Sequence, residues 1–507
     1  MTKRVHTMLY VLLAGLGVVV LGILLADKLQ LGINRYFDAD EFAYLHWAHN
    51  VFTGRIPYKD FLSYIPPGFF YLLAPLFWFT NDAGILYLGR IFSFLVFSGL
   101  VAAVIVLFWQ MRGHLLMAVT AGLLLAFIPI PADKFIEVRP DNAAMLFAVL
   151  GLIVHGLAFA SVKKTNAWFV AGVLYMASLL ILPKTLPQVV AAMGVSCLWW
   201  WKGSGVLSDR THNIMRFAAG LLTPFLIFCG WILISMRSMS ELSLVWYSLT
   251  KLPFETQRIS AMFPILPYLY FYPNNLLYGS PGWNIALIIN HAVWLLGLMT
   301  GAIRLTLPFL ANGKKGVWTE SAVAGAFLGY IASFMYGYPM RHEQYLIPVS
   351  IFVVFYAADG LTILGESMSK KSGFFVLGGI VFIVFLSGMV WVNTQVNEPK
   401  MAFSNANDYR VLNYALQTIP RGSYVFDLVG STIYYADPYY VSAVPFGQWA
   451  PYLSRPLPNI PQALEKTRTG YVYEGQLGRL DTLPADAVSY IRKSYRPSGV
   501  IPGMYSR

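Results

Sequence analysis

Long apolar segments separated by short polar stretches recur along most of the chain. Eleven of these segments approach the length of about 20 residues that an α-helix needs to cross the hydrocarbon core of a bilayer. We expect spanning helices over residues 8–25, 84–109, 115–131, 142–160, 166–182, 186–201, 213–234, 283–303, 318–336, 345–364 and 373–392. The pattern therefore predicts an α-helical polytopic membrane protein.

One further apolar run, residues 67–79, is short and follows Pro66-Pro67-Gly68. The positive-inside rule decides whether it crosses, because basic loops gather on the cytoplasmic side. If 67–79 does not cross, five basic loops lie on the side of Lys3 and Arg4. These loops contain Arg112 and His114, Lys163 and Lys164, Lys202 and Arg210, Lys314 and Lys315, and Lys370 and Lys371. We therefore predict a cytoplasmic N-terminus and one long extracytoplasmic loop, 26–83, with interfacial helices.

The pattern changes after residue 392, where polar residues alternate with short apolar patches. It predicts a helix over 409–416 and strands over 423–427 and 470–473. A segment of this length suffices for one small domain. We expect a transmembrane domain over 1–392, a second long outer loop over 235–282, and an extracytoplasmic α/β domain over 393–507, because an odd number of spans places the end outside.

Composition supports the membrane class. With 57% hydrophobic residues, 12% charged residues and a mean hydropathy of +0.58, the chain has more apolar surface than a soluble core can bury. The net charge of +12 comes from short Lys and Arg clusters between apolar segments, which argues against a nucleic-acid partner. Cys197 and Cys229 lie in apolar runs, which argues against a disulfide framework. Lys3 and Arg4 before the first run favour a retained signal anchor in the inner cell membrane.

The predicted topology brings ionisable residues to the outer face. They are Asp38, Asp40, Glu41, Glu137, Arg139, Asp141, Lys184, Arg341, His342 and Glu343. Charged groups that share one face near helix ends indicate a substrate pathway. His46 and His49 stand three residues apart on a predicted interfacial helix, where packing is favoured over metal binding. We interpret the shared face as the candidate active site.

Several motifs follow one another in order along the same face. They are Asp40-Glu41, the Gly-x-x-Pro-Tyr-x-Asp-Phe stretch from Gly54, Pro66-Pro67-Gly68, Arg90, Arg139-Pro140-Asp141, Leu182-Pro183-Lys184 and the stretch from Arg341 to Pro348. Together they resemble the GT-C glycosyltransferases, and within them the protein O-mannosyltransferase and lipid A aminoarabinose transferase group, over roughly residues 5–392. The resemblance implies inverting transfer of a hexosyl or pentosyl group from a polyprenyl-phosphate donor to an acceptor at the outer surface.

The same resemblance implies roles for individual residues. Asp40 is expected to be the general base, with Glu41 and Asp141 as further acidic residues of the catalytic set. Asp141 is equally expected to serve the start of its helix. The leaving lipid phosphate needs cations, for which we expect Lys184, Arg341, His342, Arg139 and Lys59. Tyr44, Tyr58, Tyr64 and Tyr345 are expected to line the substrate. Some relatives carry Glu-Lys before the double proline, where this chain has Tyr64-Ile65, so their phosphate-binding lysine is missing.

The resemblance requires no cofactor beyond the polyprenyl-phosphate-linked sugar, and it leaves a divalent metal open. The expected partners are membrane lipids, the donor lipid, and a glycan, lipid or protein acceptor. The alternative is a polytopic transporter or a lipid or glycan flippase, for which ionisable groups near the bilayer midplane and repeated halves would be expected. The charges gather at one surface instead, which favours the enzyme. The sequence names neither the sugar nor the acceptor.

Overall fold

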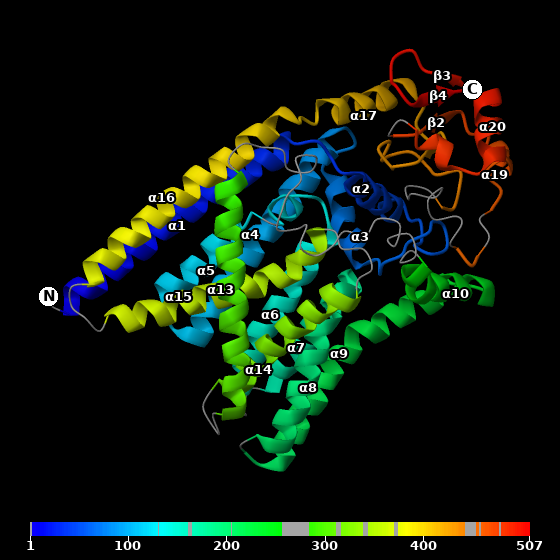
Figure 1. Cartoon of the computed structure of the whole chain (residues 1–507). Coiled ribbons are helices and arrows are strands. Elements are labelled where there is room, and N and C mark those ends of the chain that lie inside the picture. The colour runs from blue at the N-terminus through cyan, green and yellow to red at the C-terminus, as the bar shows by residue number, and fades with distance from the viewer. Residues whose placement is uncertain are drawn as a thin grey trace.

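A computed structural model gives the arrangement of the chain (Figure 1). It describes residues 3–129, 131–160, 165–203, 205–255, 283–310, 316–337, 343–369, 374–441, 453–455, 458–475 and 478–507. Most of the second long outer loop expected from the sequence, residues 256–282, lies outside these ranges, as do Arg341 and His342.

Each of the apolar segments expected to span the membrane is largely helical. The helices are α1 (Lys3–Asn34), α4 (Gly84–Arg112), α5 (Leu115–Phe127), α6 (Pro140–Ala160), α7 (Thr165–Ile181), α8 (Leu186–Lys202), α9 (Leu207–Ser235), α13 (Trp283–Leu310), α14 (Val317–Ala332), α15 (Ile347–Ser369) and α16 (Phe374–Asn397). Within the described ranges, seven helices are long and apolar enough to cross a membrane. The chain is therefore an integral membrane protein.

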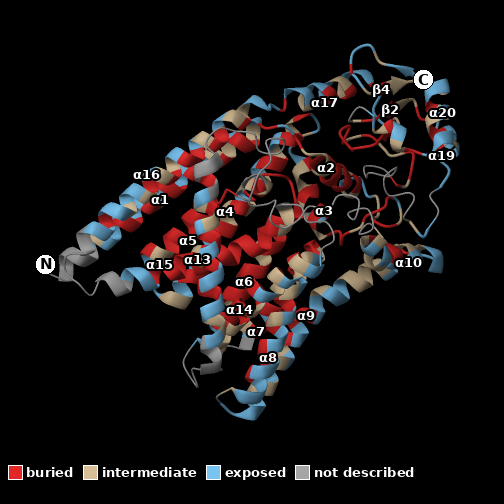
Figure 2. Ribbon diagram, viewed as in Figure 1, coloured by how far each residue is buried: buried red, intermediate tan, exposed pale blue. Residues whose placement is uncertain are grey.

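The helices form a bundle with a buried centre and an apolar exterior. In the most apolar 18-residue stretch of α15, 89% is buried. In the equivalent stretch of α9 only 17% is buried, and Figure 2 shows the difference. Close helix contacts depend on small residues. A methyl group on Gly172 of α7 or Gly220 of α9 would overlap the backbone of the other helix. Such small residues allow membrane helices to approach closely.

Buried charges pair with one another at the end of the bundle where α4 ends. Arg112 donates to Glu320 at 2.6 Å and to Asp359 at 2.8 Å, and Arg304 donates to Asp359 at 2.6 Å. These ion pairs join α4, α14, α15 and α13. Buried charges are tolerated when they are paired in this way.

An outer layer of short helices covers the other end of the bundle. It contains α2 (Ala39–Phe52), α3 (Gly68–Leu73) and a 3-10 turn over Ala74–Trp78. Residues 67–79 thus form a short helix followed by a turn, which is much shorter than a membrane span. The α10 helix (Met239–Trp246) follows α9 on the same side of the molecule (Figure 1).

The residues after α16 form a small mixed sheet flanked by helices. The elements are α17 (Ala406–Thr418), β1 (Val425–Asp427), α19 (Ile460–Lys466), β2 (Tyr471–Tyr473), α20 (Ala485–Ser494), β3 (Arg496–Pro497) and β4 (Met504–Ser506). The strand order is β1-β2-β4-β3. Val425 pairs with Tyr471 in a parallel register, and β4 is antiparallel to both β2 and β3. Both strands expected from the sequence are present.

This sheet region packs directly on the outer layer and shares its hydrophobic core. Phe42 of α2 and Phe70 of α3 belong to the same buried cluster as Phe426 of β1 and Ile491 of α20. A backbone hydrogen bond joins the two parts as well, because the amide of Leu62 donates to the carbonyl of Tyr440 at 2.9 Å. The start of α2 is therefore held from both sides, by the helical bundle and by residues near the end of the sequence.

Candidate active site

The acidic stretch Asp38-Ala39-Asp40-Glu41 begins α2, and two of its carboxylates stabilise that beginning. The Asp38 side chain accepts a hydrogen bond from the Asp40 amide at 3.0 Å, and the Glu41 side chain accepts one from the Asp38 amide at 2.9 Å. This reciprocal capping satisfies amides that an α-helix leaves without intrahelical partners. Asp40 contributes its backbone amide to the cap, but its carboxylate is not one of the capping groups.

Glu41 is fully buried and forms a bidentate ion pair with Arg90 of α4. Arg90 Nε lies 2.5 Å from one carboxylate oxygen of Glu41, and Nη2 lies 2.6 Å from the other. The amide of Val138 also donates to Glu41 at 2.8 Å. Bidentate contacts of this kind are strong and directional. Glu41 therefore joins α2 to α4 and to the loop before α6.

Arg139, in that same loop, collects three carboxylates around one guanidinium. Its Nη1 lies 2.9 Å from Asp40, its Nη2 lies 3.3 Å from Asp38, and its Nε donates to Glu137. The Arg139 side chain is 4% exposed and that of Glu137 is 1% exposed, whereas that of Asp40 is 43% exposed. Asp40 is thus the most exposed carboxylate of a set whose other end, at Glu137, is buried.

The charges of this set favour the ionised forms of Glu137 and Asp38. Burial alone would raise the pKa of Glu137, but Lys134 and Arg139 outweigh burial and hold that pKa below its usual value. Burial would likewise raise the pKa of Asp38, yet attraction from Arg139 and Lys134 lowers it well below the usual range. Lys134 lies 2.8 Å from Glu137 and 3.5 Å from Asp38. These carboxylates therefore stay ionised at neutral pH.

Asp141 and Lys184 form a second ion pair in the same region. Asp141 occupies the first turn of α6, and Lys184 Nζ lies 2.9 Å from one of its oxygens. The ammonium also lies 3.8 Å from the centre of the Tyr345 ring, a cation–π contact. Asp141 therefore both carries negative charge at a helix N-terminus and binds a lysine from the α7–α8 connection.

Three of the four expected tyrosines lie close to charged residues of these ion pairs. Tyr44 interacts electrostatically with Asp40, with Arg139 and with Asp141, and it hydrogen-bonds with Tyr64. Tyr345 interacts with Lys184 and also with Asp40. The Asp40–Arg139 pair and the Asp141–Lys184 pair consequently belong to one site.

Two other expected residues lie elsewhere. The ammonium of Lys59 lies 3.4 Å from Glu241 of α10 and 3.4 Å from the carbonyl of Ser235. Tyr58 is fully buried, and its hydroxyl donates to the carbonyl of Ile65 at 2.8 Å. The structure thus places Lys59 with the α9–α10 connection and Tyr58 inside the outer layer.

Pro66-Pro67-Gly68 packs against the end of α7, immediately before Lys184. A Cβ atom at Gly68 would lie 2.5 Å from the carbonyl oxygen of Leu180 and 3.2 Å from the amide nitrogen of Ile181. Only glycine fits against this backbone without displacement. The start of α3 therefore fixes the segment that carries Lys184.

Replacing Gly68 with alanine should destabilise the protein by about 1–3 kcal/mol, because the new methyl group overlaps rigid backbone. The thermal unfolding midpoint in detergent would report the loss. Gly15→Ala is the matched control, since a Cβ at that position meets nothing within 4 Å. Equal midpoints for the two variants would contradict the contact.

His46 of α2 makes a buried polar contact with the sheet region. One ring nitrogen lies 2.7 Å from Asp437 and the other lies 2.9 Å from the carbonyl of Ile433. Both nitrogens are therefore engaged. Among the described residues, no group of three or more His, Cys, Asp and Glu side chains is arranged to hold a metal ion. The carboxylates of Asp38, Asp40 and Glu137 contact the cationic side chains of Arg139 and Lys134 instead.

The His46–Asp437 contact should make stability depend on pH. Burial alone would lower the pKa of His46, but Asp437 outweighs it and raises that pKa above its usual value. A histidine whose pKa is higher in the folded state than in the unfolded state stabilises the protein fully at pH values below its unfolded-state pKa. This stabilisation is lost as the pH rises through the folded-state pKa. Asn50, which carries no charge, hydrogen-bonds with this ring, and Asp427 also acts on it electrostatically.

The difference in thermal midpoint between wild type and Asp437→Asn should therefore shrink between about pH 5 and about pH 9. His49→Gln is the control, because burial lowers the pKa of His49 to about 3 and its charge stays constant over this range. A difference for Asp437→Asn that does not vary with pH would count against the charged contact.

Several residues of this site were not assigned a role by sequence reasoning. Lys134, Glu137 and Arg35 surround the buried side of Arg139, with Arg35 3.6 Å from Glu137. The short spacing of Lys134, Glu137 and Arg139 before one helix was a usable signal. The pairing of Arg90 with Glu41, 49 residues away, had no local signal.

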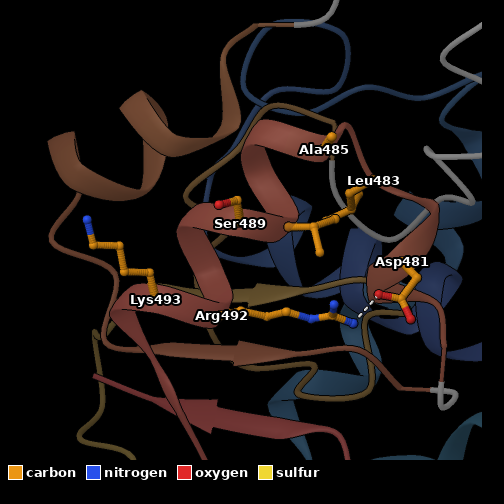
Figure 3. Close-up of a pocket in the computed structure, with 7 residues that line it drawn as sticks. Asp481, Leu483, Ala485, Ser489, Arg492 and Lys493 are labelled. Atoms are coloured by element: carbon orange, nitrogen blue, oxygen red, sulfur yellow. Dashed lines mark hydrogen bonds and ion pairs between the residues drawn. The ribbon is translucent and has the colours of Figure 1, made fainter.

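A separate surface depression lies on the sheet region, against α20. It has a volume of about 670 Å³ and is lined by Asp481, Leu483, Ala485, Val488, Ser489, Arg492 and Lys493 (Figure 3). Asp481 and Arg492 form an ion pair there between two well-exposed side chains. None of the lining residues belongs to the site around Asp40.

No protein-family model matches the sequence, and none of the curated proteins is similar enough in sequence to match it. Solved structures of an oligosaccharyltransferase from Archaeoglobus fulgidus do match in three dimensions. One, in complex with Zn and sulfate, is 13% identical to this chain, with a TM-score of 0.50. The alignment covers 96% of this chain and 73% of that structure's chain. Another, tethered through a disulfide to an acceptor peptide with the NVT sequon, is also 13% identical, with a TM-score of 0.51. The alignment covers 97% of this chain and 74% of that structure's chain.

The chain shares the fold of these oligosaccharyltransferase structures. This fold is consistent with the GT-C resemblance drawn from the sequence motifs. A third structure, the archaeal oligosaccharyltransferase AglB from the same organism with an inhibitory peptide and a dolichol-phosphate, is 14% identical, with a TM-score of 0.49. The alignment covers 90% of this chain and 69% of that one. In this chain, the site around Asp40 lies where the outer layer, the bundle and the sheet region meet.

Proposed function

We propose that this protein is an inverting glycosyltransferase that moves a sugar from a polyprenyl-phosphate donor to an acceptor at the outer face of the membrane. The observation that carries the proposal is the arrangement of Asp40. Its carboxylate is 43% exposed, is held on one oxygen by the buried Arg139, and shares a site with the Asp141–Lys184 pair. An accessible, oriented carboxylate beside a lysine is what acceptor activation and phosphate departure require.

In the proposed reaction, the second oxygen of Asp40 takes the proton of the acceptor hydroxyl as that oxygen attacks the anomeric carbon. The bond from the anomeric carbon to the phosphate oxygen breaks, and polyprenyl phosphate leaves with the electron pair. Attack opposite the leaving group inverts the anomeric centre. Holding the base and the two substrates in line supplies much of the rate enhancement.

The cations divide into two groups in this proposal. Lys184, 15% exposed, is assigned to the leaving phosphate, together with Arg341 and His342 on the sequence argument. Arg139 faces carboxylates, so we assign it to orienting Asp40. Glu41 has both oxygens engaged, and we assign it to positioning α2 rather than to proton transfer.

Tyr44 and Tyr345 are assigned to the substrate-lining surface because they interact with residues of both ion pairs, and Tyr64 because it interacts with Asp40, Arg139 and these two tyrosines. Lys59 contacts Glu241, and the Tyr58 hydroxyl donates to the carbonyl of Ile65. We therefore favour the other three tyrosines and Lys184 over these two residues as contacts of the substrate. Asp141 is assigned to holding Lys184, since the two charges contact each other directly.

The experiment is a donor-release assay. Protein purified in detergent is given a polyprenyl-phosphate sugar and a glycan, lipid or peptide acceptor, and free polyprenyl phosphate is measured. A peptide is included because the fold is shared with an oligosaccharyltransferase solved with a tethered acceptor peptide. Acceptor-dependent release is the expected result. Movement of the donor lipid across a vesicle membrane without release would instead support the alternative, a transporter or flippase.

The proposed orientation places the N-terminus in the cytoplasm and both Asp40 and the sheet region outside. After replacement of Cys197 and Cys229 by serine, single cysteines at Asn81 and at His114, both exposed, test this prediction. A membrane-impermeant maleimide on intact cells should label Asn81→Cys and spare His114→Cys. Labelling of the position-114 variant alone would reverse the topology.

A further inference from the structure

Glu137 is a buried carboxylate that the proposed reaction does not use. Its side chain is 1% exposed, so it has no access to a substrate. It contacts Arg139 Nε, Lys134 Nζ at 2.8 Å and Arg35 Nη1 at 3.6 Å. A buried carboxylate costs free energy unless it is paired, and this one is paired with three cations. Its position next to Arg139 suggests an indirect role.

The geometry of Arg139 shows what that role is. Three different nitrogens of one guanidinium contact three carboxylates, with Nε on Glu137, Nη1 on Asp40 and Nη2 on Asp38. The guanidinium is a rigid plane. Fixing the Nε edge against Glu137 therefore also fixes the direction in which Nη1 points, which is toward Asp40.

Burial explains why Glu137 can hold Arg139 better than the other two carboxylates can. Asp40 is 43% exposed and Asp38 is 32% exposed, so water and salt weaken their attraction for the guanidinium. Glu137 is shielded from solvent, and its contact is weakened least. Pro140 restricts the backbone of Arg139 but not its side chain, so the position of the guanidinium depends on contacts such as the one with Glu137.

We propose that Glu137 is a positioning residue for the general base: it fixes the Arg139 guanidinium, which in turn holds one oxygen of Asp40 and leaves the other directed to the acceptor. This inference rests on the proposed function. It assigns to Glu137 a contribution to turnover without any contact to a substrate.

The test is a double-mutant cycle in the donor-release assay with Glu137→Ala, Arg139→Ala and the double variant. Glu137→Ala should lower kcat about 10- to 100-fold, because the base is misplaced, while KM for donor and acceptor changes less than about threefold. In the Arg139→Ala background the same change should alter kcat less than about twofold, since the effect passes through Arg139. Glu137→Gln has the same shape and can still accept from Nε, so it should recover much of the rate.

All rates are expressed per folded protein, measured from the thermal unfolding transition of each variant. Wild-type kcat in Glu137→Ala, or multiplicative losses in the double variant, would overturn the positioning role. A loss of kcat in Glu137→Gln equal to that in Glu137→Ala would also overturn it. Asp40→Asn separates the two proposals, because full activity in that variant would remove the proposed function itself, whereas the cycle concerns only how Asp40 is held.

Discussion

Replacing Asp40 with asparagine should lower turnover in the donor-release assay about 100- to 10,000-fold, the range expected when a general base is removed. Asparagine has nearly the same shape but cannot take the acceptor proton. It also keeps an oxygen that can accept from Arg139 Nη1, so α2 should stay in place. The measurement is the initial rate of polyprenyl phosphate release at saturating donor and acceptor.

Asp38→Asn is the matched control. Asp38 also contacts Arg139, at 3.3 Å, and asparagine caps a helix as well as aspartate does. This variant removes one negative charge beside Asp40 without removing the cap, and its rate should fall less than about tenfold. Full activity in Asp40→Asn, or an equal loss in Asp38→Asn, would move the base away from Asp40.

Replacing Arg90 with alanine should lower the free energy of unfolding by about 3–5 kcal/mol, the usual cost of leaving a buried charge without its partner. Glu41 is 0% exposed and would keep only amide donors. The variant also loses hydrogen bonds from Arg90 to the carbonyls of Gly32 and Tyr36. Denaturant or thermal unfolding in detergent measures the change.

The exposed ion pair between Arg492 and Asp481 supplies the comparison. Its side chains are 60% and 56% exposed, and Arg492→Ala should cost less than about 1 kcal/mol. Arg90→Lys keeps the charge but not the two parallel hydrogen bonds, so its loss should fall between those of the two alanine variants. Similar losses for Arg90→Ala and Arg492→Ala would show that the buried pair contributes little.

The sequence predicted those features that depend on local pattern. The apolar segments predicted the helices, because a span must bury its own backbone in hydrocarbon. The predicted topology placed Asp40, Asp141 and Lys184 on one side of the membrane. In the structure, the side chains of Asp141 and Lys184 lie 2.9 Å from each other, although the residues are 43 positions apart in the sequence. The cap at Asp38 and Glu41 also has a local signal, an acidic residue three positions before a glutamate, although it was not predicted.

The features that sequence reasoning missed depend on contacts between distant segments. Arg90 is one arginine in a long apolar helix, and nothing near it identifies Glu41 as its partner. His46 and Asp437 are separated by 391 residues, and their contact exists only because the sheet region docks on α2. Lys134 is the exception, because its partner Glu137 is only three residues away.

The docking of the sheet region also determines when during synthesis the site can be completed. The amide of Phe37, three residues before Asp40, donates to Asp408, which lies 371 residues later in the chain. At about 5–20 residues per second, the ribosome reaches that partner roughly 20–75 seconds after it has made the acidic stretch. During this interval the nascent protein already has its first outer loop but not the side chains that pack against it. We expect a product truncated before the sheet region to leave the start of α2 unsupported, so that the proposed transferase activity would need the sheet region as well as the helical bundle.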